Sequence, residues 1–218
     1  EPDFFQKLMD KKITAIAYDY IQDEDGIFPV VRSMSEIAGN ASILIASECL
    51  SNLNQGKGLL MGGIAGVSST DVVILGAGTV GEFATRSAIG LGASVKVFDK
   101  SLSKLRRMQD KISARVDMNT INPKALEKSI RRADVVIGAI RSRDSRTPCL
   151  ISEDMVKLMK PGSVIVDVSI DRGGCIETSE ITSHKVPTFI KHGVIHYCVP
   201  NIPSRVARTA SFSLSNIF

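Results

Sequence analysis

The chain has 218 residues, of which 44% are hydrophobic, 5% aromatic and 23% charged, with a formal net charge of +4. This length and apolar content suffice for one domain with a sizeable core, or for one domain and part of another. The mild positive charge is typical of a solvated surface, and the scarcity of aromatic residues argues against a nucleic-acid-binding class.

The first 70 residues predict a helix, a strand and a second, longer helix. The opening residues are typical of a helix followed by the strand ITAIAYDY, residues 13–20. For the second helix, Ser33 or Ser35 is a candidate N-cap, with Glu36 three residues after Ser33 as in a capping box. This helix is expected to end near Asn54, before a glycine-rich turn.

After residue 70, short apolar runs alternate with amphipathic segments. Strands are predicted over residues 71–77, 94–100, 114–120, 134–140, 162–169 and 194–202, and helices over residues 79–91, 101–112, 122–133 and 152–160. Continuous β-branched runs separated by such helices are typical of a parallel sheet. The predicted fold class is therefore α/β, a Rossmann-type doubly wound parallel sheet flanked by helices.

The sequence contains neither targeting nor metal-binding signals. Its four cysteines, Cys49, Cys149, Cys175 and Cys198, form no CxxC pair and no cluster with histidine at zinc spacing, which predicts reduced thiols and no metal site. No signal peptide and no apolar run of about 18 residues is present, so we expect no membrane span and a cytoplasmic protein. The first residue is Glu1, which is consistent with a piece of a longer chain.

A glycine motif between the first apolar strand and its helix indicates a dinucleotide site. Gly76, Gly78 and Gly81 form the pattern GxGxxG, and the helix is expected to begin at Thr79. The first glycine permits a tight turn, the second lets a pyrophosphate approach the backbone, and the third allows close helix packing. The helix N-terminus would offer free N–H groups to the phosphates. The alternative is a glycine turn that holds no ligand.

Asp99 ends the second strand about 20 residues after the middle glycine. Its carboxylate is expected to accept hydrogen bonds from both ribose hydroxyls and to repel a 2′-phosphate, which favours NAD over NADP. Lys100 and Lys104 keep NADP open as an alternative.

Ligands of such sheets lie outside the carboxyl ends of the strands. Ala139 and Ile140, which end one strand, are therefore expected to flank the cofactor. Asp171 follows the next strand and precedes two glycines, so its carboxylate is a candidate to orient a water or a substrate amine beside the nicotinamide. The alternative for Asp171 is a turn residue. Asp167, inside the apolar run, is expected to be structural.

The three histidines, His184, His192 and His196, are expected to be surface or packed residues rather than catalytic bases. The segment PNIP, residues 200–203, ends the last predicted strand and is expected to border the nicotinamide.

Several strings in order resemble the alanine dehydrogenases, to which the α subunit of nicotinamide nucleotide transhydrogenase is related. They include DKKITAIAYDYIQ, MSEIAG, GKGLLMGGIAGV, VVILGAGTVG, RRADVVIGAI, SIDRGGCIETS and PTFIKHGVIHYCVPNIPS. The resemblance covers essentially the whole chain. The aspartate in SIDRGG favours the dehydrogenase over the transhydrogenase.

The resemblance implies a two-domain enzyme whose substrate domain is split. Residues 1–30 match a remnant of that substrate (catalytic) domain, residues 31–204 match the NAD-binding domain with its connector helix, and residues 205–218 match the start of a return helix. The family segment that supplies an arginine, a lysine and a histidine has no match. This chain alone is therefore expected to be inactive.

The resemblance also implies roles for particular residues. Asp171 matches the catalytic aspartate beside the nicotinamide. The residues that match cofactor contacts are Ser35, Gly76, Gly78, Thr79, Val80, Gly81, Asp99, Asn201 and Ile202. Ala139 and Ile140, placed by their position at a strand end, complete the candidate cofactor site. The implied reaction is the reversible oxidative deamination of L-alanine to pyruvate and ammonia, with hydride transfer to NAD.

One loop departs from the family pattern. The segment RSRDSRTP, Arg141–Pro148, replaces a loop that is apolar and contains Gly-Pro in typical members. This leaves the substrate and the cofactor preference open, and it keeps a saccharopine-dehydrogenase-like activity on a larger amino acid as an alternative. A transhydrogenase module and a regulatory nucleotide-binding domain without chemistry are further alternatives.

The connector helix is also a candidate for self-association into a homo-oligomer. Its apolar residues exceed what one packing face needs, and related enzymes assemble through this region. They are Ile37, Ala41, Leu44, Ile45 and Ala46. The alternative is a core helix that packs wholly within its own domain.

Overall fold

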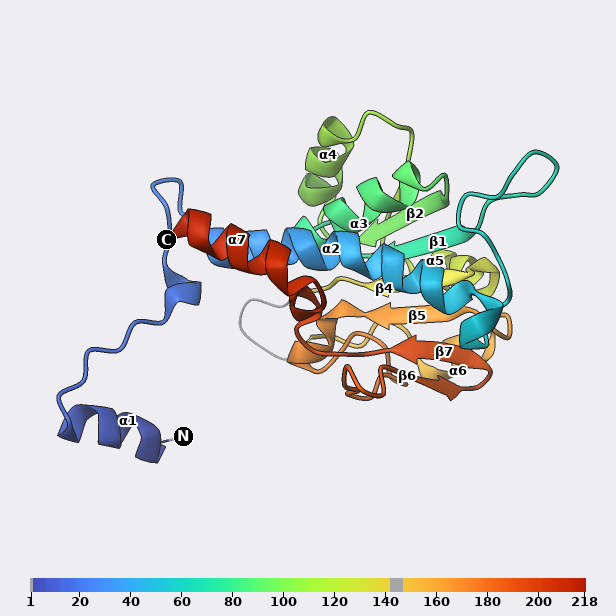
Figure 1. Ribbon diagram of the computed structural model, residues 1–218. Coiled ribbons are helices and arrows are strands. Elements are labelled where there is room, and N and C mark those ends of the chain that lie inside the picture. The colour runs from blue at the N-terminus through green and yellow to red at the C-terminus, as the bar shows by residue number, and fades with distance from the viewer. Residues whose placement is uncertain (1, 142–146) are drawn as a thin grey trace.

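A seven-stranded sheet forms the centre of the computed structural model, which describes residues 2–141 and 147–218 (Figure 1). The strands are β1 (Asp71–Leu75), β2 (Ser94–Asp99), β3 (Asp117–Thr120), β4 (Val135–Gly138), β5 (Val164–Asp167), β6 (Thr188–Lys191) and β7 (Val194–Tyr197). Their order is β3-β2-β1-β4-β5-β7-β6, and each neighbouring pair is parallel except β6 and β7. This is the predicted doubly wound α/β fold.

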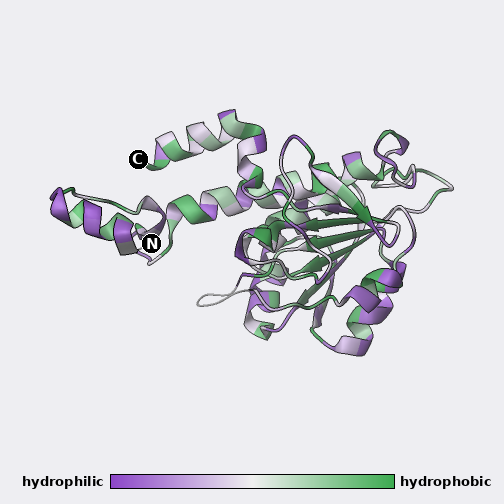
Figure 2. Cartoon of the chain, turned by 90° about the horizontal axis from the view of Figure 1, so that it is seen from below, coloured by the Kyte–Doolittle hydropathy of each residue, from purple (hydrophilic) through white to green (hydrophobic). Residues whose placement is uncertain are grey.

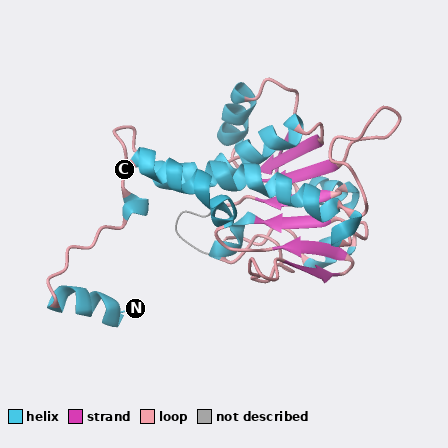
Figure 3. Ribbon diagram, in the orientation of Figure 1, coloured by secondary structure: helices cyan, strands magenta, loops and turns pink. Residues whose placement is uncertain are grey.

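Helices cover both faces of this sheet (Figure 3). The helices are α1 (Pro2–Asp10), α2 (Pro29–Leu50), α3 (Thr79–Gly90), α4 (Leu102–Lys111), α5 (Pro123–Arg132), α6 (Glu153–Lys157) and α7 (Ala207–Ile217), with short 3-10 turns η1 (Tyr18–Tyr20), η2 (Asn52–Asn54), η3 (Val168–Arg172) and η4 (Ile202–Val206). Helices α2, α3 and α4 pack with Val72 and Ile74 on one face, whereas α5 and α6 pack with Val73 and Leu75 on the other.

Strand burial explains the continuous apolar runs. The four residues of β4, of β5 and of β7 are all buried, because helices lie on both sides of them. Figure 2 shows hydrophobic residues along the strands and mixed colours along the helices, whose polar faces turn to solvent. Full burial of one Val, Ile or Leu side chain stabilises the folded state by about 1.5–3 kcal/mol, because apolar surface is removed from water.

The strand order places a switch point between β1 and β4. From β1 the chain proceeds to β2 and β3 on one side, and from β4 it proceeds to β5 on the other. The connections therefore diverge at the carboxyl ends of these two neighbours. In open α/β sheets a crevice lies at this point, and ligands bind there.

Two predictions for the first 50 residues were wrong. Residues 13–20 form no strand: they are exposed coil followed by η1. No described strand lies beside them, so their backbone has no ladder to join. The capping box was also wrong, because α2 begins earlier, at Pro29, whose fixed φ suits the first turn of a helix. Ser33 and Ser35 consequently lie inside the helix, where the Ser35 hydroxyl donates to the Val31 carbonyl at 2.7 Å.

The strand β6 was missed by the sequence analysis. It pairs antiparallel with β7 through a tight turn at His192 and Gly193, both of which have positive φ. Three of its four residues are only half-buried, so β6 lacks the continuous apolar run that marks the central strands.

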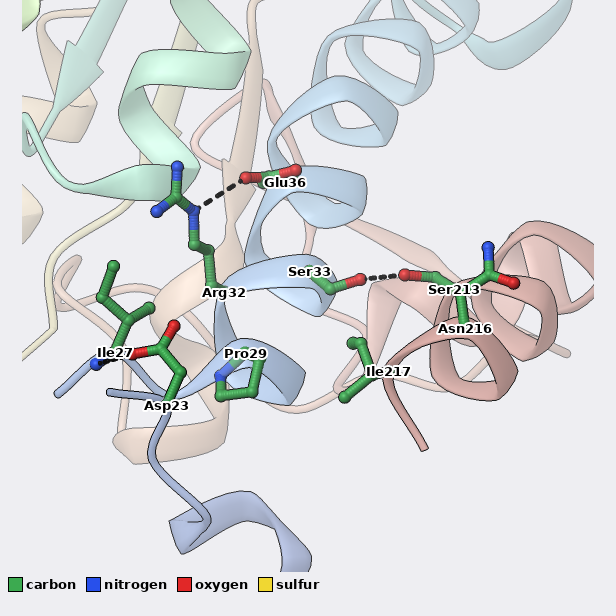
Figure 4. Close-up of a pocket in the computed structure, with 9 residues that line it drawn as sticks. All are labelled: Asp23, Ile27, Pro29, Arg32, Ser33, Glu36, Ser213, Asn216 and Ile217. Atoms are coloured by element: carbon green, nitrogen blue, oxygen red, sulfur yellow. Dashed lines mark hydrogen bonds and ion pairs between the residues drawn. The ribbon is translucent and has the colours of Figure 1, made fainter. Parts of the chain in front are cut away.

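The first half of α2 and the whole of α7 lie side by side and extend away from the sheet (Figures 1 and 3). Figure 4 shows Ser33 of α2 and Ser213 of α7 pointing toward one another, and their hydroxyls are hydrogen-bonded. A small cavity of about 320 Å³ lies beside this contact, next to the Arg32–Glu36 ion pair.

The N-terminal segment, residues 2–28, lies largely apart from the sheet (Figure 1). It exposes several large apolar side chains, among them Phe4, Phe5 and Ile16. None of the described helices combines the length and the apolar character that crossing a membrane requires.

An ion cluster fastens the glycine-rich connection to the opposite, amino edge of the sheet. The Asp134 carboxylate accepts hydrogen bonds from Lys57 Nζ at 2.5 Å, from Lys160 Nζ at 3.0 Å and from the Asp71 backbone N–H at 3.0 Å. Burial raises the pKa of Asp134, but these three donors outweigh burial and leave the pKa below its ordinary value.

Replacing Asp134 with Asn should therefore destabilise the chain by about 1–3 kcal/mol at pH 7, because two lysines lose their counter-charge in a partly buried site. A carboxyl whose pKa is lowered on folding stabilises the protein above its unfolded pKa of 3.8, and this contribution is lost as the pH falls through the folded value. Urea unfolding at pH 7 and pH 3 checks both statements. Asp154→Asn, which removes an exposed ion pair to Lys157, is the control and should change little.

Candidate functional site

A cleft of about 810 Å³ lies at the carboxyl ends of the central strands. Its walls come from α2, the first turn of α3, the residues after β4, the η3 turn after β5, and η4 after β7. The η1 turn of the N-terminal segment closes one side through Tyr18 and Tyr20. The cleft therefore occupies the switch-point crevice that the strand order predicts.

Seven of the predicted site residues line this cleft together. They are Ser35, Val80, Ala139, Ile140, Asp171, Asn201 and Ile202. Gly76, Gly78, Thr79 and Gly81 are not among its lining residues but form the adjoining turn between β1 and α3 and the start of α3, and Asp99 ends β2 beside that turn. These five residues do not line the cleft themselves. They adjoin it, because Val80 in the first turn of α3 belongs to its wall.

The three glycines of the turn face different surroundings. A Cβ on Gly81 would lie 1.8 Å from the Gly76 carbonyl oxygen, and one on Gly76 would lie 2.4 Å from the Ala139 carbonyl oxygen. By contrast, a Cβ on Gly78 would meet no protein atom within 4 Å, and the φ of Gly78, −83°, is one that any residue adopts. Packing within the chain thus explains Gly76 and Gly81 but leaves Gly78 unexplained.

Asp99 is buried at the end of β2, with 4% of its surface exposed. One carboxylate oxygen accepts the Ala77 backbone N–H at 2.7 Å, and the other accepts the Ser101 backbone N–H at 2.7 Å. Asp99 therefore fixes the glycine turn to β2. Each oxygen retains a second lone pair that can accept a further hydrogen bond.

Asp167 and Asp171 lie close in sequence but in different environments. Asp167 is fully buried, and it accepts hydrogen bonds from the backbone N–H groups of Ser169 and Cys175, both at 3.0 Å, and from the Ser179 hydroxyl at 2.8 Å. The structural role predicted for Asp167 agrees with these contacts. Asp171 lines the cleft instead, where partial burial raises the pKa of its carboxyl against the lowering effects of the Asn201 backbone N–H and Arg172.

Two arginines line the same cleft as Asp171. Arg141 follows β4 and Arg172 ends η3, and both line the cleft. Burial lowers the pKa of Arg141, and the positive charge of Arg172 lowers it further. The other arginines of the divergent loop, at positions 143 and 146, lie outside the described residues.

Sequence reasoning missed part of the cleft wall. The additional lining residues include Tyr18, Asp19, Tyr20, Phe28, Met34, Arg172, Ser204 and Leu214. Arg172 could have been predicted as a cleft residue, because it directly follows Asp171. The η1 residues could not, because the sequence analysis assigned them to a strand.

No histidine or cysteine is among the residues that line the cleft, although His184 Nε2 lies 2.8 Å from the hydroxyl of Ser204, which does line it. His196 is buried in β7, where Thr178 and Phe189 contact its ring, and burial lowers its pKa to about 4. His192 pairs with Glu153 on the surface, at 2.6 Å. Burial raises the pKa of Cys49 to about 11 and that of Cys198 to about 12, so both remain protonated thiols at neutral pH. Within the described ranges, no group of three or more metal-ligating side chains is gathered.

Comparison with known proteins gives one consistent family. The profile described as "Alanine dehydrogenase/PNT, C-terminal domain" matches residues 42–218. The chain is 45% identical over 217 residues to the alanine dehydrogenase of Methanococcus maripaludis, with 99% of this chain and 58% of the relative covered. It is 43% identical over 212 residues to alanine dehydrogenase 2 of Staphylococcus aureus, with 97% and 57% covered.

Solved structures agree with the sequence relatives. A structure of L-alanine dehydrogenase superposes with a TM-score of 0.93 at 40% identity, covering 98% of this chain and 59% of that one. The transhydrogenase from Sinorhizobium meliloti superposes with a TM-score of 0.72 at 26% identity, covering 84% and 52%. The chain thus spans less than three fifths of the length of the curated relatives it matches.

Proposed function

Because this chain belongs to the alanine dehydrogenase/PNT family, we propose that it is the NAD(H)-binding part of an NAD-dependent amino-acid dehydrogenase. The protein that contains it would interconvert L-alanine with pyruvate and ammonia. Residues 31–204 would be the cofactor domain, and residues 1–30 and 205–218 would lead into the substrate domain. The observation that carries the proposal is the vacant space beside Gly78.

The surroundings of Gly78 fit a phosphate group. A group outside the protein chain would explain a glycine there, since no described protein atom lies within 4 Å of a Cβ built on Gly78. The N-terminus of α3 has no side-chain cap, so its first N–H groups face the same space. Unpaired N–H groups and the positive end of the helix dipole favour an anion. A pyrophosphate would therefore lie over Gly78 and Thr79.

The rest of the cofactor would extend from there into the cleft. Asp99 would accept the ribose hydroxyls with its remaining lone pairs. Ala139, Ile140 and Ile202 would pack against the nicotinamide end of the cleft, with Ser35 of α2 on the facing wall. These small and apolar side chains would exclude water from the ring.

Asp171 is the candidate catalytic residue in this arrangement. When bound, the nicotinamide supplies the hydride acceptor at the end of the cleft. A carboxyl with a raised pKa takes up a proton more readily than an exposed carboxyl, which suits Asp171 to exchange a proton with a water or a substrate amine. Asp171 would hold that proton, and the cleft wall would hold the substrate in line with the ring.

The test of the proposed activity uses the whole protein. We expect NAD-dependent release of ammonia and pyruvate from L-alanine, followed by NADH absorbance. A screen of larger amino acids in parallel decides whether Arg141 and Arg172 select a different substrate. Absence of NADH formation with every amino acid would reject the dehydrogenase.

A transhydrogenase module is the second candidate, because the transhydrogenase structure superposes over 84% of this chain. Such a module would pass hydride from NADH to a second nucleotide domain instead of to an imino acid. Two results together would favour this alternative. NADH would reduce an NADP analogue only when a partner subunit is present, and alanine would release no ammonia.

Loss of the Asp99 carboxylate should shift the cofactor preference. We expect Asp99→Ala to weaken NADH binding by about 1–3 kcal/mol, because two hydrogen bonds to a charged acceptor are lost. NADPH binding should weaken less, since the repulsion of its 2′-phosphate also disappears. Calorimetric titration measures the ratio of the two affinities, and damage to the glycine turn alone would weaken both equally. Asp117→Ala is the control. It removes the carboxylate at the first residue of β3, which pairs with Lys96, and it should leave the ratio of the two affinities unchanged.

We also propose that the whole protein self-associates through α2, although less of this helix is available than its sequence suggested. Ala41, Ile45 and Ala46 are buried within the domain, whereas Leu44 is 56% exposed. Leu44→Lys should therefore lower the mass measured by light scattering, and Gln109→Lys on the exposed side of α4 should not. A monomer before any substitution would contradict the proposal.

A further inference from the structure

Helix α2 carries a glycine, Gly39, near the middle of its 22 residues. Inside a helix glycine is less favourable than alanine, because it loses more conformational freedom on folding. A Cβ on Gly39 would lie 2.5 Å from the Val80 carbonyl oxygen, 2.8 Å from the Phe83 Cβ and 3.0 Å from the Ala84 backbone nitrogen. The missing side chain therefore lets α2 approach α3 more closely than any other residue would allow.

The part of α3 that Gly39 contacts is its beginning. Helices α2 and α3 lie side by side on one face of the sheet (Figure 1), and α3 starts at Thr79. Another face of the same first turn packs on the sheet, where a Cβ on Gly81 would lie 1.8 Å from the Gly76 carbonyl oxygen. The first turn of α3 thus contacts the β1 turn on one face and α2 on another, with a glycine at each contact. Because protein interiors are close-packed, its position depends on both neighbours.

The contact at Gly39 also adjoins the cleft. Ser35 and Ala38 of α2 line the cleft, and Val80 lines it from α3. Gly39 directly follows Ala38, and its nearest neighbour in α3 is the backbone of Val80. The seat of α2 on α3 therefore sets how far apart these two walls of the cleft stand.

We propose that Gly39 is a positioning residue for the cofactor, which seats α2 against the first turn of α3 and so places the α3 N-terminus under the pyrophosphate. The proposal rests on the proposed function for the identity of the ligand, but the packing contact does not. An ordinary contact of a Cβ starts at 3.4 Å, so a side chain at Gly39 must push the two helices apart by about 1 Å. The N–H groups at the start of a helix bind an anion together, and such a shift weakens several of these bonds at once.

The test compares Gly39→Ala with Gly62→Ala in the whole protein. A Cβ on Gly62 would lie 2.1 Å from the carbonyl oxygen of Leu91, the residue that caps the end of α3. Both variants thus press a methyl group against a backbone carbonyl, one at the first turn of α3 and the other at its last. Both should unfold at a lower urea concentration than the parent, because both sites are overpacked.

Only Gly39→Ala should weaken NADH binding, by about 10-fold or more, whereas Gly62→Ala should stay within about twofold of the parent. Calorimetric titration measures the affinities under conditions in which circular dichroism shows both variants to be folded. Unfolding then does not enter the comparison, since an incompetent fraction lowers the apparent affinity only in proportion to its population. Equal NADH affinities in the two variants would overturn the proposal.

Titration with ADP locates the loss within the site. ADP has the pyrophosphate but lacks the nicotinamide, so Gly39→Ala should weaken ADP binding as well. Unchanged ADP affinity together with weakened NADH binding would mean that Gly39 acts on the nicotinamide end of the cleft. That result would contradict the role assigned to the α3 N-terminus.

Hydrogen exchange of backbone amides, measured without ligand, tests the contact independently of the proposed function. The Glu82 N–H forms a helical hydrogen bond in the first turn of α3, and the Leu91 N–H forms one at its end. Gly39→Ala should speed exchange at Glu82 more than at Leu91, and Gly62→Ala should do the reverse. If the parent binds neither NADH nor ADP, the proposed function fails, and the exchange still decides the packing role. The same exchange pattern in both variants would overturn that role.

A milder pair of variants decides the matter if Gly39→Ala does not fold. The Ser87 hydroxyl donates to the Asn40 side-chain oxygen at 2.5 Å, which joins the same two helices at an exposed position. Asn40→Ala removes this bond and should weaken NADH binding about threefold. Asn54→Ala, which removes a bond to the Glu48 carbonyl at the far end of α2, is the control and should leave NADH binding unchanged. Equal affinities in the two asparagine variants would reject the proposal.

Discussion

Replacing Asp171 with Asn should reduce turnover of the whole protein by about 10²-fold or more, the scale of a lost acid–base contribution. NADH affinity should remain close to that of the parent, because the substitution is nearly isosteric and Asp171 is expected to contact the substrate side of the ring. Steady-state kinetics with L-alanine and calorimetric titration of NADH measure the two effects. Near-normal turnover would assign the proton transfer to another residue.

The stability of the same variant separates catalysis from a structural role. Burial raises the pKa of Asp171, so the ionised form costs stability at pH values above the folded pKa. Asn removes that cost, and the melting temperature at pH 7 should be unchanged or slightly higher. Asp167→Asn is the contrast, because it replaces a buried acceptor of three hydrogen bonds and should lower the melting temperature.

Alanine at Gly78 and alanine at Gly81 should have opposite consequences. Gly81→Ala places a Cβ 1.8 Å from the Gly76 carbonyl oxygen, so α3 must move away from β1. We expect this variant to lose about 3 kcal/mol of stability or more. Gly78→Ala meets no protein atom within 4 Å and suits the observed φ, so its stability should stay within about 0.5 kcal/mol of the parent.

The same Gly78→Ala variant should nevertheless bind NADH about 10-fold or more weakly, because the added methyl group occupies the space assigned to the pyrophosphate. Urea unfolding measures the stabilities, and calorimetry measures the affinities. Undiminished NADH binding by Gly78→Ala would place the phosphates elsewhere.

The central strands and helices could be predicted from the sequence because their signals are local. The apolar runs of β1, β4 and β5 are continuous, since helices cover both faces of the sheet. The glycine motif is also local, as it lies within one strand–turn–helix unit. The position of Asp171 in the cleft could be predicted because a polar residue a few positions after a buried strand lies at the binding edge of a parallel sheet.

The elements that were missed depend on contacts distant in sequence. Residues 13–20 have strand-like composition but no described partner strand, and β6 becomes a strand only by pairing with β7. The start of α2 is fixed by Pro29 and not by the serines that follow it. The link between His184 and Ser204 joins two loops, and no sequence pattern connects them.

The most direct test of the account is calorimetric titration of the unsubstituted protein with NADH and, separately, with NADPH. The structure has a buried carboxylate, Asp99, beside a glycine turn whose middle residue leaves open space. We expect saturable one-to-one binding of NADH, and weaker binding of NADPH because its 2′-phosphate meets that carboxylate. Absence of saturable NADH binding, or NADPH binding of equal or greater affinity, would contradict the assignment of this chain as an NAD(H)-binding domain.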